Sequence, residues 1–362
     1  MIFAKKIEGV DVSSMIKNHE WTSNTVYSEY SHLDGDLIDK QFYTVVDDTT
    51  EYNVYKCLSN NKGANSTVAP SRVGSLADLN PIITGDNYVW KYMYTITKAN
   101  YDKFSSNAYI PVTANSVVMD NAVPGSIEVI KINDGGTGYN NYIANAILSV
   151  GDINVGGVAT IFGAPSSAVA IDDYYQGCVM KLTSGAGIDQ YRKIVNYDGT
   201  SQQKKFTLET AFTIAPAVGD QYEIYPYIFV WGDGSESIPA EGRAIIDSSS
   251  ANSIAEIEML SVGRNYRYGV SYAGETPDTN MVSIASVYIQ LPSVIRLDPN
   301  FTEADLLPII SPQNGHGANP YEELFATRVC VSSRFANTEG GLLSTNNDFR
   351  QVGIIKNPLL LS

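Results

Sequence analysis

The stretch GDNYVWKYMYTIT, residues 85–97, carries the clearest secondary-structure signal in the chain. After an opening Gly-Asp turn, bulky apolar side chains recur at every second position. Because successive side chains of a β-strand point to opposite faces, this alternation predicts a strand with one aromatic face and a buried Trp90. The aromatic face comprises Tyr88, Trp90, Tyr92, Tyr94 and Ile96. The other face comprises Val89, Lys91, Met93, Thr95 and Thr97.

Upstream of this stretch, EYNVYKCLS (residues 51–59) is a second expected strand. It carries apolar residues on both faces, which favours a central position in a sheet. The connection NNKGANSTVAPSRVGSLADLNPIITGDN is rich in Gly, Pro and Asn and has no clear period, so we expect a long loop there.

The middle of the chain, residues 165–226, has the pattern of a compact antiparallel module. Its expected strands are CVMKLTS, QYRKIVNYD, KKFTLET and QYEIYPY. Asp198-Gly199 is a hairpin signal and Gly219-Asp220 marks another turn. Short strands at this spacing predict a small β-barrel or sandwich.

An internal repeat brackets that module. SIEVIKINDGGTGY (126–139) aligns without gaps to SIAEIEMLSVGRNY (253–266). The coinciding pairs are Ser126/Ser253, Ile127/Ile254, Ile130/Ile257, Gly136/Gly263 and Tyr139/Tyr266. Gly138 aligns with Asn265, and these two residue types best tolerate positive φ. We expect one strand-plus-turn unit used twice, side by side in one sheet; chance agreement between β-rich segments is the alternative.

Helix signals are scarce. The best is NPYEELFATR (319–328), where Asn319 can cap the helix and Pro320 can take its first position. Glu322 and Glu323 then stand in the first turn, where the helix dipole favours acidic groups. A weaker helix signal is TKANYDKF, which directly follows the aromatic strand. The fold class is therefore expected to be mainly β, with packed antiparallel, sandwich-like sheets and few short helices.

Composition excludes several classes of function. The chain has 362 residues, 44% of them hydrophobic, so it can form a substantial core. A net charge of -15 without a clustered basic patch argues against nucleic acid as a partner. The three cysteines are far apart and form no CxxC, so buried thiols are expected rather than disulfides or zinc ligands. Since no apolar run approaches twenty residues, we expect a soluble protein with no membrane insertion and no cleaved signal peptide.

Sequence motifs for catalysis are absent. The three histidines, His19, His32 and His316, have no metal-ligand spacing, and His316 lies among turn-forming glycines. The adjacent carboxylates Asp47-Asp48, Asp172-Asp173 and Glu322-Glu323 would point to opposite faces of a strand. We therefore predict no catalytic residue, cofactor or metal; a glycoside hydrolase with two separated carboxylates is the enzymatic alternative.

Several segments together carry a family likeness. VYKCLSN, then APS, then GDNYVWKYMYTI, with DFRQVGIIKNPL near the end, resemble the baseplate wedge protein of T-even-type contractile-tailed bacteriophages in order and spacing. The segment ISPQNGHGANPYEEL also resembles sequences in related phage structural proteins. The arm before Val54 is short for that family, and residues 125–292 have no close counterpart in its smaller members.

The resemblance implies a non-enzymatic subunit of the virion tail baseplate, assembled in the host cytoplasm. It would be a homodimer within a wedge, contact other tail proteins and take part in the switch before sheath contraction. The residues carried over, expected to form the central sheet and its turns, are Cys57, Gly85, Asp86, Tyr88, Val89, Trp90, Phe349, Arg350, Gln351, Asn357 and Pro358. Arg350 could also bind a partner's carboxylate, because its planar guanidinium suits that group.

An inserted middle region would leave one core domain made from both ends of the chain, residues 1–124 plus 293–362. Residues 125–164 plus 227–292 would be a repeat-bearing connector, and 165–226 the inserted module. We expect the strand near 350 to pair beside the strand at 88–96, which would hold the end of the chain in place. The alternative function is a receptor- or glycan-binding tail protein that uses the tyrosine-rich middle module as an adhesin.

Overall fold

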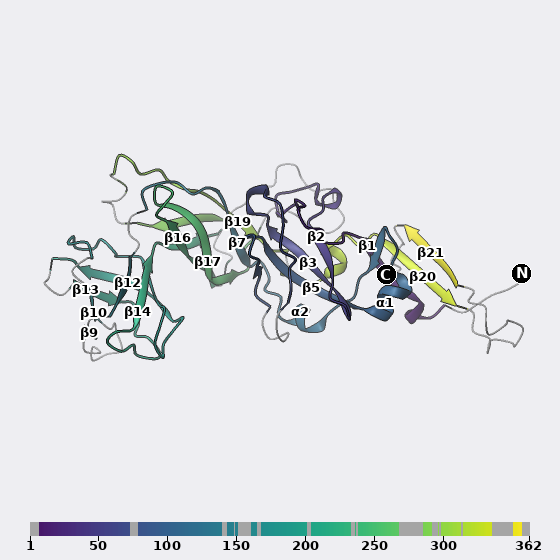
Figure 1. The fold of residues 1–362 in the computed structure, drawn as a ribbon, viewed down its shortest axis with the longest axis horizontal. Coiled ribbons are helices and arrows are strands. Elements are labelled where there is room, and N and C mark those ends of the chain that lie inside the picture. The colour runs from purple at the N-terminus through teal and green to yellow at the C-terminus, as the bar shows by residue number, and fades with distance from the viewer. Residues whose placement is uncertain are drawn as a thin grey trace, which may run out of the picture. The chain divides into compact units, whose positions relative to one another are not determined.

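The computed structural model describes the backbone over most of the chain, namely residues 7–72, 79–139, 143–147, 149–150, 161–164, 168–200, 204–232, 236, 238–267, 285–291, 296, 298–312, 314–334 and 350–356. Side chains are described in these ranges except at 143–145, 149–150, 161–164, 333–334 and 350–356. The chain forms two units (Figure 1). Unit 1 takes its described residues from 7–125 and 311–356, and unit 2 from 126–267 and 285–310. The predicted mainly β fold is confirmed.

The first sheet of unit 1 contains both strands that the sequence predicted most clearly. Its order is β2-β3-β5-β4, and all its pairs are antiparallel. The strands are β2 (Tyr43–Asp47), β3 (Glu51–Ser59), β4 (Ile82–Ile83) and β5 (Val89–Thr97). β3 lies between β2 and β5, so its predicted central position is confirmed (Figure 1).

Both faces of β5 are largely buried. Trp90 has no exposed surface, as predicted, and it packs with Tyr27, Tyr55, Cys57 and Tyr88. The strict alternation predicted along the strand is wrong beyond its middle. The pairing with β3 shifts there, because β5 has one extra residue at that point. Strict alternation would place Tyr92 and Thr95 on opposite faces, but their hydroxyls hydrogen-bond at 2.6 Å.

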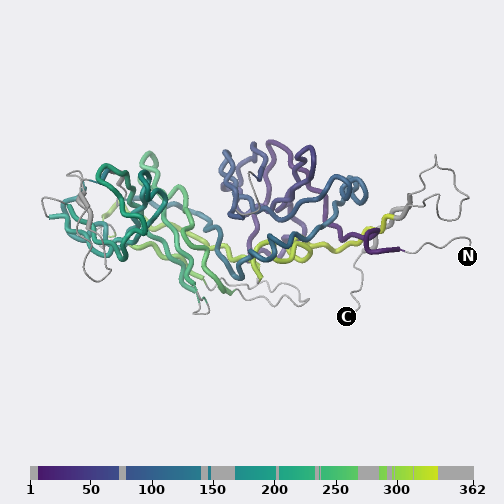
Figure 2. Tube along the Cα trace, turned by 90° about the horizontal axis from the view of Figure 1, so that it is seen from below, coloured from purple at the N-terminus to yellow at the C-terminus, as the bar shows by residue number. Residues whose placement is uncertain are grey.

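The second sheet of unit 1 joins the two ends of the chain. Its order is β21-β20-β1-β6, formed by β1 (Val12–Lys17), β6 (Tyr109–Pro111), β20 (Arg328–Arg334) and β21 (Arg350–Lys356). In Figure 2 the purple β1 segment lies beside the yellow-green β20 segment, and the two pair antiparallel. The predicted pairing of the late strand with the 88–96 strand is wrong. β5 already pairs with β3 and β4 on its two sides, and β21 pairs with β20 instead.

The helices of unit 1 are short. They are α1 (Lys98–Phe104), α2 (Ser116–Asp120) and α4 (Pro320–Glu323), with 3-10 turns η1 (Gly9–Asp11), η2 (Leu37–Asp39) and η3 (Asn61–Gly63). The two predicted helices form, and α4 begins at the predicted Asn319 cap. α4 is shorter than predicted because Phe325 adopts φ +56° and the chain then enters β20.

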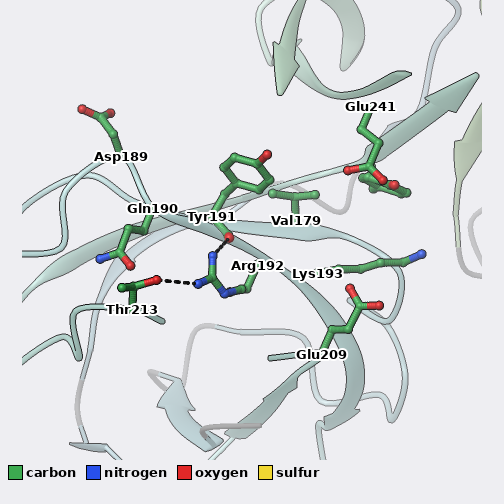
Figure 3. Close-up of a pocket in the computed structure, with 10 residues that line it drawn as sticks. Val179, Asp189, Gln190, Tyr191, Arg192, Lys193, Glu209, Thr213 and Glu241 are labelled. Atoms are coloured by element: carbon green, nitrogen blue, oxygen red, sulfur yellow. Dashed lines mark hydrogen bonds between the residues drawn. The ribbon is translucent and has the colours of Figure 1, made fainter. Parts of the chain in front are cut away.

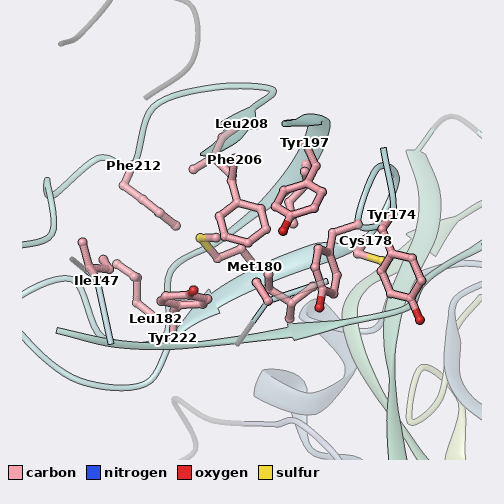
Figure 4. Close-up of a cluster of buried hydrophobic side chains, with 14 residues drawn as sticks. Ile147, Tyr174, Cys178, Met180, Leu182, Tyr197, Phe206, Leu208, Phe212 and Tyr222 are labelled. Atoms are coloured by element: carbon pink, nitrogen blue, oxygen red, sulfur yellow. The ribbon is translucent and has the colours of Figure 1, made fainter. Parts of the chain in front are cut away.

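Unit 2 contains a seven-stranded antiparallel sheet of order β8-β14-β11-β12-β13-β10-β9. The predicted strands of the module form as β11 (Val179–Leu182), β12 (Tyr191–Asp198), β13 (Lys204–Leu208) and β14 (Gln221–Tyr225). The sheet also includes β8 (Ile143–Ala146), β9 (Ser149–Val150) and β10 (Ile161–Ala164), which lie before residue 165. Figure 4 shows Phe206, Tyr197 and Tyr222 in the core that this sheet contributes to.

The other part of unit 2 is a sandwich. One layer has the order β17-β16-β15-β18, formed by β15 (Tyr227–Trp231), β16 (Ile238–Asp247), β17 (Ser253–Arg264) and β18 (Ser286–Gln290). The other layer pairs β7 (Ile127–Asp134) with β19 (Asp305–Ile310). Ile130, Ile228 and Ile254 from the two layers share one buried cluster. The predicted three-part domain division stays a prediction, although residues 305–310, assigned there to the core domain, pair with β7 in unit 2.

The two repeat copies have the same local geometry. φ is +61° at Gly136 and +64° at Gly263, and it is +83° at Gly138 and +68° at Asn265. The predicted repeat of a strand plus turn is therefore confirmed. The predicted placement in one sheet is wrong: β7 pairs with β19 and β17 with β16, so the copies lie in facing layers of the sandwich. A hydrogen bond of 2.9 Å from the Ile254 N–H to the Gly135 carbonyl joins them.

Candidate functional site

The Gly85-Asp86 turn of the resemblance organises a loop in unit 1. The Asp86 carboxylate accepts hydrogen bonds from the N–H groups of Thr67 and Val68, at 2.6 and 2.9 Å, and from the Ser66 hydroxyl at 3.1 Å. Burial would raise the pKa of Asp86, but the hydroxyl of Thr84 and these backbone donors lower it to about 2. Asp86 therefore fastens the 66–68 segment to the beginning of β5 as a charged acceptor.

The other residues carried over from the resemblance are placed around this turn or at the chain's end. Tyr88, Trp90 and Cys57 belong to one buried cluster, and Val89 begins β5 opposite Ile83. The Tyr88 hydroxyl donates to the Ala64 carbonyl, across the same loop that Asp86 holds. Arg350 and Gln351 form the start of β21, where their backbones pair with Arg334 and Ser333. Phe349, Asn357 and Pro358 lie outside the described residues.

A buried ion pair joins two segments that the resemblance treats separately. Lys56, in the VYKCLSN stretch, contacts the Glu323 carboxylate, in the NPYEEL stretch. The Lys56 side chain has no exposed surface and the Glu323 side chain is 5% exposed. The other Glu323 oxygen accepts from the N–H groups of Gly317, at 2.8 Å, and Asn319, at 3.2 Å. This arrangement was missed from sequence, where the one available signal was a lysine within an apolar strand.

The surroundings of this pair keep it charged. Burial would raise the pKa of Glu323, but Lys56 and then His316 hold it below its ordinary value. His316 Nδ1 lies 3.9 Å from the carboxylate, and Lys56 Nζ lies 4.7 Å from the centre of the Tyr30 ring. The adjoining cavity, of about 80 Å³, is far smaller than the roughly 300 to 1,000 Å³ of small-molecule sites. The ion pair therefore has the features of a structural junction.

The remaining predicted candidates have local structural roles. Asp172 accepts from the N–H groups of Gly199 and Thr200, and Asp47 accepts from that of Thr49. Burial lowers the pKa of His32 to about 4. All three cysteines are buried thiols. Within the described ranges, no group of three His, Cys, Asp or Glu residues could hold a metal ion.

A hollow larger than the cavity beside Glu323 lies in unit 2, lined by residues of β12, β15 and β16 among others. It is a cleft of about 500 Å³ lined mainly by polar and aromatic side chains: Val179, Asp189, Gln190, Tyr191, Arg192, Lys193, Glu209, Thr213, Tyr227 and Glu241. Figure 3 shows that Lys193 lies between Glu209 and Glu241 in this view. Most of these residues belong to the tyrosine-rich region, but the sequence did not indicate which of its tyrosines line a cleft.

One wall of the cleft is held by hydrogen bonds of Arg192, and the other carries charged side chains. The Arg192 guanidinium donates to the Ala211 carbonyl at 2.9 Å. It also donates to the Thr213 hydroxyl at 3.3 Å (Figure 3). Lys193 Nζ lies 4.6 Å from the centre of the Tyr227 ring. Burial, and then the charge of Glu241, raises the pKa of Tyr227. The cleft therefore offers hydrogen-bonding groups next to a neutral aromatic ring, an arrangement suited to a polar ligand.

In the described part of the chain, no helix combines the length and apolar character that crossing a bilayer requires. Comparisons of the chain with protein-family models, with curated proteins and with solved structures found no match.

Proposed function

We propose that the chain is a non-enzymatic structural subunit of the tail baseplate of a contractile-tailed bacteriophage. In this proposal it is a homodimer within a baseplate wedge, joins neighbouring tail proteins and takes part in the switch before sheath contraction. The proposal starts from the resemblance of VYKCLSN, GDNYVWKYMYTI and DFRQVGIIKNPL to the wedge family. The mainly β fold agrees with what that resemblance implies.

The observation that carries the proposal is the buried pair of Lys56 and Glu323. It brings together VYKCLSN and NGHGANPYEEL, two segments that resemble phage structural proteins and are far apart in sequence. Burying an ion pair costs desolvation free energy, so such a pair is a poor way to join two segments unless it fixes one geometry between them. A subunit that transmits force between neighbours needs such fixed geometry more than it needs an open site.

The edge strand β21 provides a surface for assembly. In the described part of the sheet β21 pairs with β20 alone, and it lies at one edge. The outer backbone groups of an edge strand can pair with a strand from another chain. This supports a role in which the motif near the end of the chain contacts a neighbouring subunit.

The decisive experiment locates the chain in the particle. Virions of the phage that encodes it are purified, separated into heads and tails, and analysed by mass spectrometry. Antibodies against the recombinant chain are then used to label intact virions for electron microscopy. We expect the protein in the tail fraction and label at the distal end of the tail. Light scattering of the purified chain should give a dimer mass. A strictly monomeric protein that is absent from virions would refute the proposal.

A second candidate function, a receptor- or glycan-binding tail protein, is favoured by one observation. The cleft of about 500 Å³ in unit 2 combines tyrosines with carboxylates and cationic side chains. It lies in the tyrosine-rich region that the sequence marked for this role, and it is compatible with a place in the same particle.

A further inference from the structure

An aromatic ladder leads outward from the cleft across the face of the four-stranded layer. Tyr227, Phe229 and Trp231 alternate along β15, so their side chains share one face, and the opposite face belongs to the sandwich core. On β18, Tyr288 pairs directly with Phe229. The rings stack, with centroids 6.1 Å apart for Tyr227 and Phe229 and 5.3 Å apart for Phe229 and Tyr288.

Exposure increases along this ladder. Tyr227, which lines the cleft, is 7% exposed, whereas Tyr288 is 49% and Trp231 is 60% exposed. Exposed apolar side chains that are contiguous, unlike those scattered singly, mark interaction sites, and these two rings continue the stacked ladder that begins at Tyr227.

Lys193 also borders a second hollow. This hollow, of about 820 Å³, is also lined by Asp172, Asp173, Gln176 and Gln290. Gln290 pairs with Tyr227 across β15 and β18, so it stands on the same face as the aromatic ladder. The two hollows adjoin at Lys193, and we call them together the groove; a chain-like ligand that reaches both suits this arrangement better than a single small molecule.

The groove's chemistry selects among classes of ligand. Its acidic residues are Asp172, Asp173, Asp189, Glu209 and Glu241, against the cations Arg192 and Lys193. Phosphate and other polyanions would meet net repulsion there, in a chain whose total charge is already -15. Carboxylates accept hydrogen bonds from hydroxyl groups, and ring faces attract the weakly positive C–H groups of a pyranose.

We infer that this groove, together with the aromatic ladder that begins at Tyr227, binds a neutral oligosaccharide, with the exposed rings of Trp231 and Tyr288 stacking on sugar units that extend beyond the groove. Glu209 and Glu241 accept hydrogen bonds from the sugar hydroxyls on either side of Lys193. The charged groups that would suit a basic peptide are present too, but the stacked and exposed rings favour the saccharide. This inference deepens the second candidate function, the glycan-binding tail protein, and rests on it; it does not depend on the baseplate role.

A glycan array tests the inference with the full-length protein. The array carries neutral and anionic bacterial surface oligosaccharides, and a hit is then titrated as the free oligosaccharide by isothermal calorimetry. We expect binding to at least one neutral oligosaccharide. Trp231→Ala, Tyr288→Ala and Glu209→Gln should each weaken binding about tenfold or more. Tyr321→Ala is the matched control, because Tyr321 is 38% exposed in unit 1 and lies outside the groove, and it should bind like the wild type.

The outcomes separate clearly. All variants should keep the wild-type denaturation midpoint and light-scattering mass, so that a loss of binding reports on the groove. No binding to neutral glycans, binding to anionic glycans alone, or unchanged affinity in the three groove variants would overturn the inference. A change of oligomeric mass in Trp231→Ala or Tyr288→Ala would instead assign the ladder to a contact between subunits and would also overturn it. A chain that is found in the tail but binds no glycan would leave the proposed function intact.

Discussion

Lys56 and Glu323 form a buried ion pair, although 267 residues separate them along the chain. Lys56 belongs to β3, in the middle of the first sheet of unit 1, and Glu323 ends the short helix α4. The pair therefore links the segment with which the chain returns to unit 1 to the sheet β2-β3-β5-β4. Removing one partner would leave a buried charge without compensation, which is much worse than removing both.

The first prediction is that Glu323→Gln destabilises the protein by about 3 to 5 kcal/mol, because Lys56 then stays buried and unpaired. Glutamine keeps an oxygen for the N–H groups of Gly317 and Asn319, so the change isolates the charge. The free energy of unfolding is measured by urea denaturation, followed by circular dichroism. Glu322→Gln, at the exposed neighbouring position, is the control and should change stability by less than about 0.5 kcal/mol. The double variant Lys56→Met/Glu323→Leu should be more stable than Glu323→Gln. If it is less stable, the pair stabilises the protein by more than the mutual compensation of two buried charges.

Asp86 gives the second prediction, which concerns pH. Its pKa is lowered to about 2 from an ordinary 3.8, so its contribution to stability is present above pH 3.8 and is lost as the pH falls through about 2. Asp86→Asn should destabilise the protein by about 1 to 2 kcal/mol at pH 7, a modest effect because the carboxylate is half-buried. The difference between wild type and variant should shrink between pH 4 and pH 2. Urea denaturation at a series of pH values measures it, and a difference independent of pH would contradict the charged-acceptor role.

Sequence patterns predicted local structure here and failed on distant pairing. The strands at 51–59 and 88–96, the strands of the module and the cap at Asn319 follow from periodicity and turn residues within a few positions. Nothing local determines which strand β21 joins, because each edge offers the same backbone groups. The sequence also gave no reason to pair Lys56 with Glu323 rather than Glu322, since both glutamates suit the first turn of α4. The unit 2 groove could not be predicted from the sequence for the same reason, because its walls come from strands far apart in the chain.

The third prediction is that Trp90→Ala costs about 3 to 5 kcal/mol, as expected for emptying a fully buried aromatic site. Trp231→Ala is the matched control, because it removes the same side chain from a position that is 60% exposed. It should change the free energy of unfolding by less than about 0.5 kcal/mol. Chemical denaturation of both variants gives the comparison. Equal losses in the two variants would mean that Trp90 is not part of a cooperative core.

The last prediction uses the repeat. At Gly263 a Cβ atom would lie 2.6 Å from the Ala240 nitrogen, and at Gly136 it would lie 2.8 Å from the Ala304 nitrogen. These are the same N–H groups that donate to the Tyr266 and Tyr139 hydroxyls, both at 2.8 Å. Replacing either glycine with alanine should therefore have two effects, strain in the backbone and displacement of the tyrosine hydroxyl. Together they should lower the free energy of unfolding by about 2 to 4 kcal/mol.

Two other glycines separate the causes. Gly219 has φ +97° with open space around it, so Gly219→Ala should cost only about 1 to 2 kcal/mol from backbone strain. Gly9 has neither a positive φ nor a close neighbour, and Gly9→Ala should be nearly neutral. Urea denaturation measures the free energy of unfolding of all four variants, Gly136→Ala, Gly263→Ala, Gly219→Ala and Gly9→Ala, and so ranks their losses of stability. If Gly136→Ala and Gly263→Ala cost no more than Gly219→Ala, the close approach to the neighbouring strand contributes nothing, and the two copies share a backbone shape without sharing a packing role.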